Sequence, residues 1–343
     1  MRKLDIKLKE FLLKQEDKKV LKRTRHKCWR KQENRKNEGL SKKRISYLKK
    51  VDDSVLFVPP RVFSLRDNTE PVLKFISELK SYKNIKKDIF INLSRVEKIT
   101  NGSIAMLLSI IQELSSKGII LRGRKPKAKI PKKIIEKSGF FNYVIGAIDE
   151  ENIQSLDTII TKGMDVVDQE STAEIVLQSM VTVSGENLRN QPIQGMLIEL
   201  MANSVNHAYP ETKKKKWVLS VNHDTENKKA SFAFVDNGFG IIETLNLNIK
   251  QSFKKVFSGN IDLLTTAFEG RIGSRTGLNY RGKGLPSIYR KYKQNYFKEF
   301  VVITNNVFLD FEKGNSVILK NSFYGTFFYW ELNQECNYYG KDT

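Results

Sequence analysis

One short stretch in the first half of the chain constrains the fold more than any other, because nearly all of its residues are apolar. Residues 104–111 read IAMLLSII, and Leu114 continues the pattern at helical spacing. A helix over residues 103–116 is therefore apolar around much of its girth and must be covered on more than one side. The run is too short to span a bilayer, so other parts of the protein have to cover it.

Strand-like and helix-like runs alternate around this helix. The sequence predicts strands at 55–60, 88–94 and 118–123, and another helix over 71–79. These strands are almost wholly apolar, which is typical of strands buried on both faces of a sheet. The alternation predicts a small α/β layer fold.

Composition and cysteine content exclude several classes of protein. The chain has 343 residues, a length typical of two domains, and 40% of them are hydrophobic, which is enough for real cores. Its two cysteines, Cys28 and Cys336, rule out a disulfide scaffold and a cysteine-rich zinc module. No apolar signal-peptide segment follows the basic start, so we expect a cytoplasmic protein without a membrane span.

Much of the net charge of +22 lies in a basic N-terminal arm. Residues 1–50 hold 20 Lys/Arg and 6 Asp/Glu, a net of +14, and apolar residues recur at helical spacing from Leu4 to Leu12. The partly helical arm could neutralise nucleic-acid phosphates, with Trp29 stacking on a base, or it could lie on an anionic membrane surface. It could equally be a solvated tail or a helix docked on a neighbour. No recognisable nucleic-acid motif accompanies the charge, so these alternatives stay open.

The second half of the chain begins with an amphipathic helix that starts near Gln191 and is expected to stop before Pro210. Its polar side carries Glu199, Asn203 and Asn206, opposite a row of apolar side chains. A carboxylate one turn from an amide oxygen can orient water and bind a hard cation such as Mg2+.

Two glycine-rich turns and a Gly-Thr pair follow this helix. Apolar strands at 217–224 and 230–236 lead into DNGFG at 236–240, where a fixed acceptor sits at a turn that a flat ring can approach. The segment NYRGKGL at 279–285 places glycines ahead of an apolar-periodic helix, whose amino terminus would attract anions. A final Gly-Thr pair at 325–326 precedes an apolar strand.

These four motifs, in this order, resemble the Bergerat ATP-binding fold of the GHKL superfamily. That fold is shared by type II topoisomerases, the large heat-shock chaperones, histidine kinases and mismatch-repair ATPases. Residues 199–208 match the N box, 236–240 the first glycine box, 282–285 the second glycine box, and 325–326 the late Gly-Thr pair. One such motif is common by chance, whereas four in register are specific.

The resemblance implies ATP and Mg2+ as ligands, with defined roles for single residues. Asp236 would accept from the adenine amine, and Thr326 would hold a bridging water. Asn203 would bind Mg2+ through its side-chain oxygen, and Glu199 would be the general base. Residues 241–281 would form a lid over the phosphates. The other expected ATP-binding positions lie in or beside the two glycine boxes: Gly238, Gly240, Ile241, Gly282, Lys283, Gly284 and Leu285.

The first half also resembles a known family. From Ile91 onward, the order of strand, short loop, apolar helix, strand and final helix is similar to the STAS domain of anti-anti-sigma factors. In that family the loop carries a serine that a partner kinase phosphorylates, whereas the aligned stretch here, residues 99–103, reads ITNGS and lacks a serine at either of the two serine positions. Thr100 and Ser103 are nearby hydroxyls, but a turn at 101–102 with Ser103 as helix N-cap explains the segment without phosphorylation. The resemblance implies an interaction or scaffold domain with a protein partner.

The expected organisation is α/β throughout. A basic arm at 1–50 precedes a STAS-like α/β domain at 51–150, a connector at 151–185 and a Bergerat-fold α/β sandwich at 186–343.

Three functions fit this organisation. The first is a Mg-dependent ATPase or ATP-gated switch that controls partner interaction in bacterial signalling or defence. The second is a protein serine/threonine kinase of the anti-sigma type, acting in trans because the acceptor serine is missing in cis. The third is a nucleic-acid-binding effector gated by ATP. Many relatives of this fold dimerise, so the resemblance leaves a homodimer open.

Overall fold

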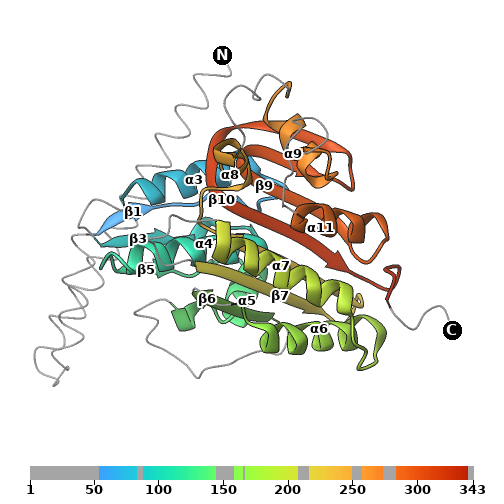
Figure 1. Cartoon of the computed structure of the whole chain (residues 1–343). Helices are drawn as coiled ribbons and strands as arrows, with labels where there is room; N and C mark the ends of the chain where they lie inside the picture. Colours follow the sequence, from blue (N-terminus) through green and yellow to red (C-terminus); the bar gives the residue numbers. More distant parts are fainter. Residues whose placement is uncertain are drawn as a thin grey trace, which may run out of the picture.

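The structure, a computed structural model, has a layered α/β architecture (Figure 1). A small parallel sheet is followed by a layer of helices, a five-stranded antiparallel sheet and a second layer of helices. The arm predicted at 1–50 lies outside the described residues. The structure describes residues 54–82, 88–143, 158–164, 167–207, 216–248, 257–272 and 283–338.

The first half of the chain forms the small sheet and the helices beside it. The strands of the sheet, in the order β1-β3-β5, are β1 (Val55–Phe57), β3 (Ile89–Asn92) and β5 (Leu121–Arg124). A separate parallel pair joins β2 (Val62–Phe63) to β4 (Lys98–Ile99). The helices of this half are α3 (Thr69–Ser81), α4 (Asn101–Ser115) and α5 (Lys129–Lys137).

Helix α4 confirms the prediction of a helix that is covered on more than one side, because eleven of its residues are buried. The predicted N-cap was wrong. Thr100 has an extended backbone, and its side chain accepts from the Ser103 backbone N–H at 3.4 Å. The Ser103 hydroxyl instead accepts from the Leu65 backbone N–H at 3.2 Å, so it joins α4 to the chain ahead of α3.

The second half forms the five-stranded sheet, in the order β6-β7-β8-β10-β9. Its strands are β6 (Thr158–Met164), β7 (Lys216–Asp224), β8 (Lys229–Asp236), β9 (Lys298–Asp310) and β10 (Asn315–Leu332). Its helices are α6 (Gln169–Ser184), α7 (Gln191–His207), α8 (Ile241–Asn248), α9 (Asn260–Phe268) and α11 (Gly284–Lys293).

The stretch predicted as a connector, residues 151–185, includes both β6 and α6. β6 pairs with β7 along its whole length, and α6 packs against α7. As an edge strand reading TIITKGM, β6 lacks the long apolar run by which the central strands are recognised.

The five-stranded sheet is buried on both faces. Val218, Ala233 and Val235 point toward α3, α4 and the small sheet, in one continuous core. Leu219 and Phe234 point the opposite way, into a core shared with α6, α7, α9 and α11. Burial on both faces accounts for the mostly apolar sequences of β8 and of residues 327–330 in β10. Among the described helices, none has the length and apolarity to cross a membrane.

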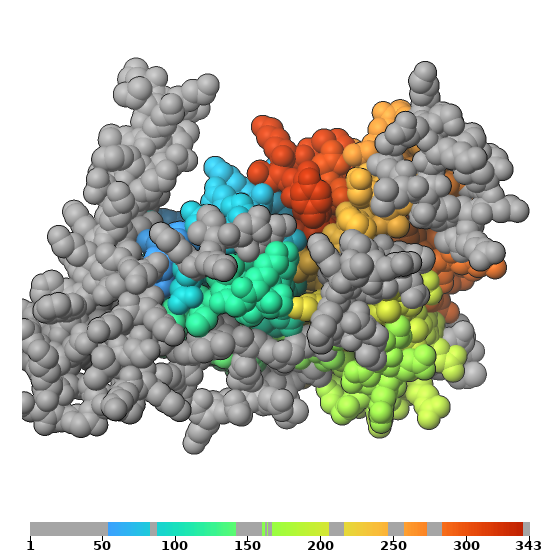
Figure 2. All heavy atoms as spheres, turned by 60° about the vertical axis from the view of Figure 1, so that its left-hand side comes forward, coloured from blue at the N-terminus to red at the C-terminus, as the bar shows by residue number. Residues whose placement is uncertain are grey.

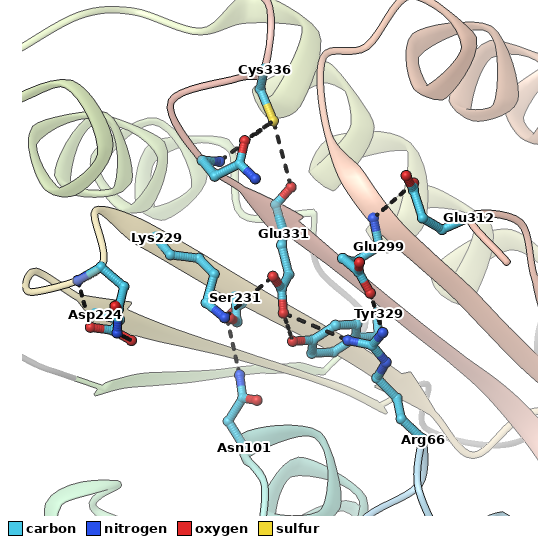
Figure 3. Close-up of polar contacts among 12 residues, drawn as sticks. Arg66, Asn101, Asp224, Lys229, Ser231, Glu299, Glu312, Tyr329, Glu331 and Cys336 are labelled. Carbon is cyan, nitrogen blue, oxygen red and sulfur yellow. Dashed lines mark hydrogen bonds and ion pairs between the residues drawn. The ribbon is translucent and has the colours of Figure 1, made fainter.

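Charged contacts join the first half to the edge of the large sheet (Figure 3). The Arg66 guanidinium pairs with Glu299 and lies 3.6 Å from Glu331, and it stacks 4.9 Å from the centre of the Tyr329 ring. The side-chain amide of Asn101, at the start of α4, donates to the Ser231 carbonyl of β8 at 3.0 Å. The two halves are therefore held together by polar contacts as well as by a common core.

The two halves approach each other closely at Gly102. A Cβ atom there would lie 2.9 Å from Cζ of the buried Phe327 ring. We expect Gly102→Ala to lower the free energy of unfolding by about 1–3 kcal/mol through overpacking. Gly195→Ala in α7 is the matched control, because its Cβ would meet only Lys291 Nζ, at 3.5 Å. That change should be neutral or stabilising by up to about 1 kcal/mol. Urea denaturation measures both, and equal effects of the two variants would contradict the expectation.

Candidate functional site

Asp236 and Thr326 lie side by side at one end of the large sheet. Asp236 is the last residue of β8, Thr326 is its direct partner on β10, and both are buried. The Gly238 backbone N–H donates to Asp236 Oδ1 at 2.8 Å, and the Thr326 hydroxyl also bonds to this carboxylate. Ser204 Oγ of α7 is 3.5 Å from Asp236 Oδ2. The carboxylate is thus fixed on the side of the sheet that faces α7.

Burial raises the pKa of Asp236 from 3.8 to about 6. Hydrogen bonds from Gly238, Thr326 and Ser204 and the positive charge of Lys80 lower it, but burial is the larger effect. The carboxylate is therefore ionised at neutral pH at a free-energy cost. An added hydrogen-bond donor at this position would reduce that cost.

The glycine of the Gly-Thr pair is required by the close approach of the strands. Gly325 has φ 142°, and a Cβ atom there would overlap the backbone carbonyl of Asp236 and the Phe323 ring. The absence of a side chain at position 325 lets Thr326 lie directly opposite Asp236.

Two residues of β9 that the sequence prediction missed hold the loop after Asp236. Thr304 Oγ1 accepts from the Ile241 backbone N–H at 2.8 Å, and Asn305 Nδ2 donates to the Phe239 carbonyl at 2.8 Å. Gly240, at φ 83°, leaves the space that Asn305 Oδ1 occupies. A signal was present in the sequence, because the polar run TNN interrupts the apolar strand VVITNNVF.

Glu199 and Asn203 meet the amino end of α11. A Cβ atom at Gly284 would overlap Glu199 Oε1 and would lie 3.0 Å from Asn203 Nδ2. Both side chains are half-buried, and the predicted apolar side of α7 is confirmed, since Ile193 and Leu200 are buried. Glycine at position 284 therefore lets the first turn of α11 lie directly on this carboxylate and this amide.

Lys291 is a second residue that sequence reasoning missed. It follows Gly284 by seven residues on α11, which places both on one face of the helix. Burial lowers the pKa of its ammonium group, and the charge of Glu199 acts in the opposite direction. The site therefore contains a partly desolvated cation near the Glu199 carboxylate.

The structure thus gathers the predicted residues into two neighbouring groups that meet at α7. Gly238, Thr326 and Ser204 of α7 all bond to the Asp236 carboxylate, while Glu199 and Asn203 of α7 lie against Gly284. The remaining predicted positions flank these groups. Ile241 opens α8, Lys283 is exposed just ahead of α11, Leu285 is half-buried within α11, and Gly282 lies outside the described residues. Of the predicted lid, 241–281, the described parts contain α8 and α9.

The donor set fits a magnesium ion that arrives with a ligand. Within the described ranges, no group of three His, Cys, Asp or Glu side chains could hold a metal ion. The Asn203 amide oxygen is a hard ligand beside the Glu199 carboxylate, and the amino end of α11 adjoins both. An ion held there would need further oxygens from a bound anion such as a phosphate.

Comparison with known proteins does not assign a function to the chain. No protein-family model matches the chain, and no curated protein matches it significantly.

Proposed function

We propose that the chain binds Mg-ATP in a GHKL-type site on the large sheet and acts as an ATPase or ATP-gated switch. The observation that carries this proposal is the pairing of the buried Asp236 with Thr326 beside a helix whose Glu199 and Asn203 meet the amino end of α11. Asp236 would accept from the adenine amine, and Thr326 would hold the bridging water. A buried carboxylate with a raised pKa, placed beside polar groups from other elements, is typical of functional sites.

The chain's own groups would handle the phosphates and the proton. Backbone N–H groups at the start of α11 would point at the phosphates, with Lys283 and Lys291 as nearby positive charges. Asn203 would hold Mg2+, which neutralises phosphate charge when bound. Glu199 would accept a proton from water as the water oxygen attacks the terminal phosphorus and ADP leaves.

The first half of the chain would be a STAS-like scaffold that has lost the switch. Its loop at 99–103 is covered by the large sheet, because Asn101 bonds to Ser231 and Gly102 packs on Phe327. Phe327 points away from the face that Asp236 and α7 share. This arrangement disfavours phosphorylation of the protein's own loop, so a kinase reaction would act on another protein, in trans.

Binding of Mg-ATP is expected to raise the melting temperature. At an ATP concentration about 100 times its Kd, linkage adds about 2.7 kcal/mol to the free energy of unfolding. Differential scanning fluorimetry with Mg-ATP measures this. Mg-GTP is the matched ligand control, because guanine carries a carbonyl oxygen where adenine has its amine, and this oxygen cannot donate to the Asp236 carboxylate. An equal shift with both nucleotides, or no shift with either, would contradict the adenine site.

Labelled ATP separates the two enzymatic alternatives. Release of inorganic phosphate by the full chain supports the ATPase, whereas label on a serine or threonine of an added protein supports the kinase. Tight ATP binding with neither product would leave the gated switch as the function.

A further inference from the structure

A second strongly basic region lies within the folded part of the chain. Residues 124–137, from the end of β5 through α5, contain seven lysines and arginines and a single acid, Glu136, a net of +6. We call this region the α5 basic surface. It is separate in sequence from the arm at 1–50 and from all residues of the nucleotide site.

Four lysines of this surface face solvent. Lys127, Lys129, Lys132 and Lys133 are all exposed, and within the described residues none of their ammonium groups has an ion-pair partner. The one acid is already neutralised, because Glu136 pairs with Lys125 at 2.9 Å. The surface therefore presents a concentration of uncompensated positive charge.

The apolar side of α5 is used by the protein's own core. Pro131 and Ile135 are buried, and Ile134 packs against the core shared with α4. Ile130, with 74% of its surface exposed, is the one large apolar side chain of α5 that is exposed. An amphipathic helix that inserts into a membrane surface presents an apolar face to the lipids. The α5 basic surface offers charge without such a face, which favours a polyanion recognised through its phosphates.

We propose that the α5 basic surface binds the phosphate backbone of nucleic acid without sequence preference. A helix of nine residues is about 13 Å long, which matches roughly four successive phosphates of one DNA strand. Three of the four exposed lysines lie on this helix, and Lys127 lies two residues ahead of it. In Figure 2 the segment, green on the colour bar, lies at the surface in the middle of the view. The inference does not depend on the ATP site.

The test measures the salt dependence of binding by the full chain. Fluorescence anisotropy of a short labelled DNA duplex is recorded over a series of salt concentrations, for the parent and for the triple variant Lys129→Gln, Lys132→Gln, Lys133→Gln. Each lost phosphate contact should reduce the slope of log K against log salt by about 0.9, so a reduction of two to three is expected. Affinity at low salt should fall by about tenfold or more.

The matched control removes three exposed lysines elsewhere: Lys117→Gln, Lys228→Gln, Lys313→Gln. It should keep the parent's slope, and both variants should keep the parent's melting temperature. The proposal is overturned if the full chain binds no nucleic acid, or if the α5 variant and the control behave alike. It is also overturned if the α5 lysines matter only for binding to phosphatidylserine vesicles, which would make this a lipid-binding surface.

Discussion

Asp236→Asn should make the ligand-free protein more stable and abolish its response to Mg-ATP. Burial raises the pKa of Asp236 from 3.8 to about 6, so ionising it in the folded state costs about 3 kcal/mol above pH 7. Asparagine keeps an oxygen for the Gly238 N–H and carries no charge. The same change presents an amide where adenine requires a carboxylate acceptor, so the thermal shift with Mg-ATP should be lost.

The effect of Asp236→Asn on the free energy of unfolding should depend on pH in a defined direction. Because the folded-state pKa is raised, the contribution of Asp236 to stability is complete below about pH 4 and is lost as pH rises through about 6. The stability difference between variant and parent should therefore grow from pH 5 to pH 8 in urea denaturation. Adenine binding favours the ionised carboxylate, so ATP affinity of the parent should rise over the same range.

A matched control is available in the same sheet. Asp310 is also buried, at the turn between β9 and β10, where it accepts from the Lys313 backbone N–H at 3.0 Å. Asp310→Asn should keep the Mg-ATP shift. A stabilised Asp236→Asn protein that still responds to Mg-ATP would place the adenine elsewhere.

Glu199→Gln should separate ATP binding from hydrolysis. Glutamine keeps the shape that fits against Gly284, but it cannot take a proton from the attacking water. Phosphate release should fall by about 100- to 10,000-fold, while the thermal shift with Mg-ATP stays within a few degrees of the parent value. Glu243→Gln, an exposed acid of α8, is the control and should release phosphate at the parent rate.

Two other results would change this interpretation. Unchanged phosphate release in Glu199→Gln would show that another group activates the water. If Glu199→Gln lost both the thermal shift and phosphate release, Glu199 would be a binding residue. Its proximity to Lys291 would then explain the loss of binding.

The sequence predicted those elements whose apolar pattern is strong and local. The helix expected over 103–116 is α4, and the strands expected at 217–224 and 230–236 are β7 and β8, each within two residues. The edge strand β6 was missed, because its polar residues obscure the alternation of apolar and polar side chains that identifies a strand. The cap at Thr100 was missed because two hydroxyls compete for the role and only tertiary contact with Leu65 decides between them.

The residues of the candidate site could be named from the sequence, but the residues that pack around them could not. Asp236, Thr326, Glu199 and Asn203 could be named because their motifs are short and ordered along the chain. Lys291 could not be named, since its proximity to Glu199 depends on how α11 packs against α7. Local patterns carry no information about such a contact between distant segments.

The shared core has a practical consequence for anyone who divides this protein. A fragment that begins at residue 158 would uncover Val218, Ala233, Val235 and Phe327, which now pack against α3 and α4. A sheet face of that size and apolarity promotes aggregation in water. Activity, stability and binding therefore have to be measured on a polypeptide that retains both halves.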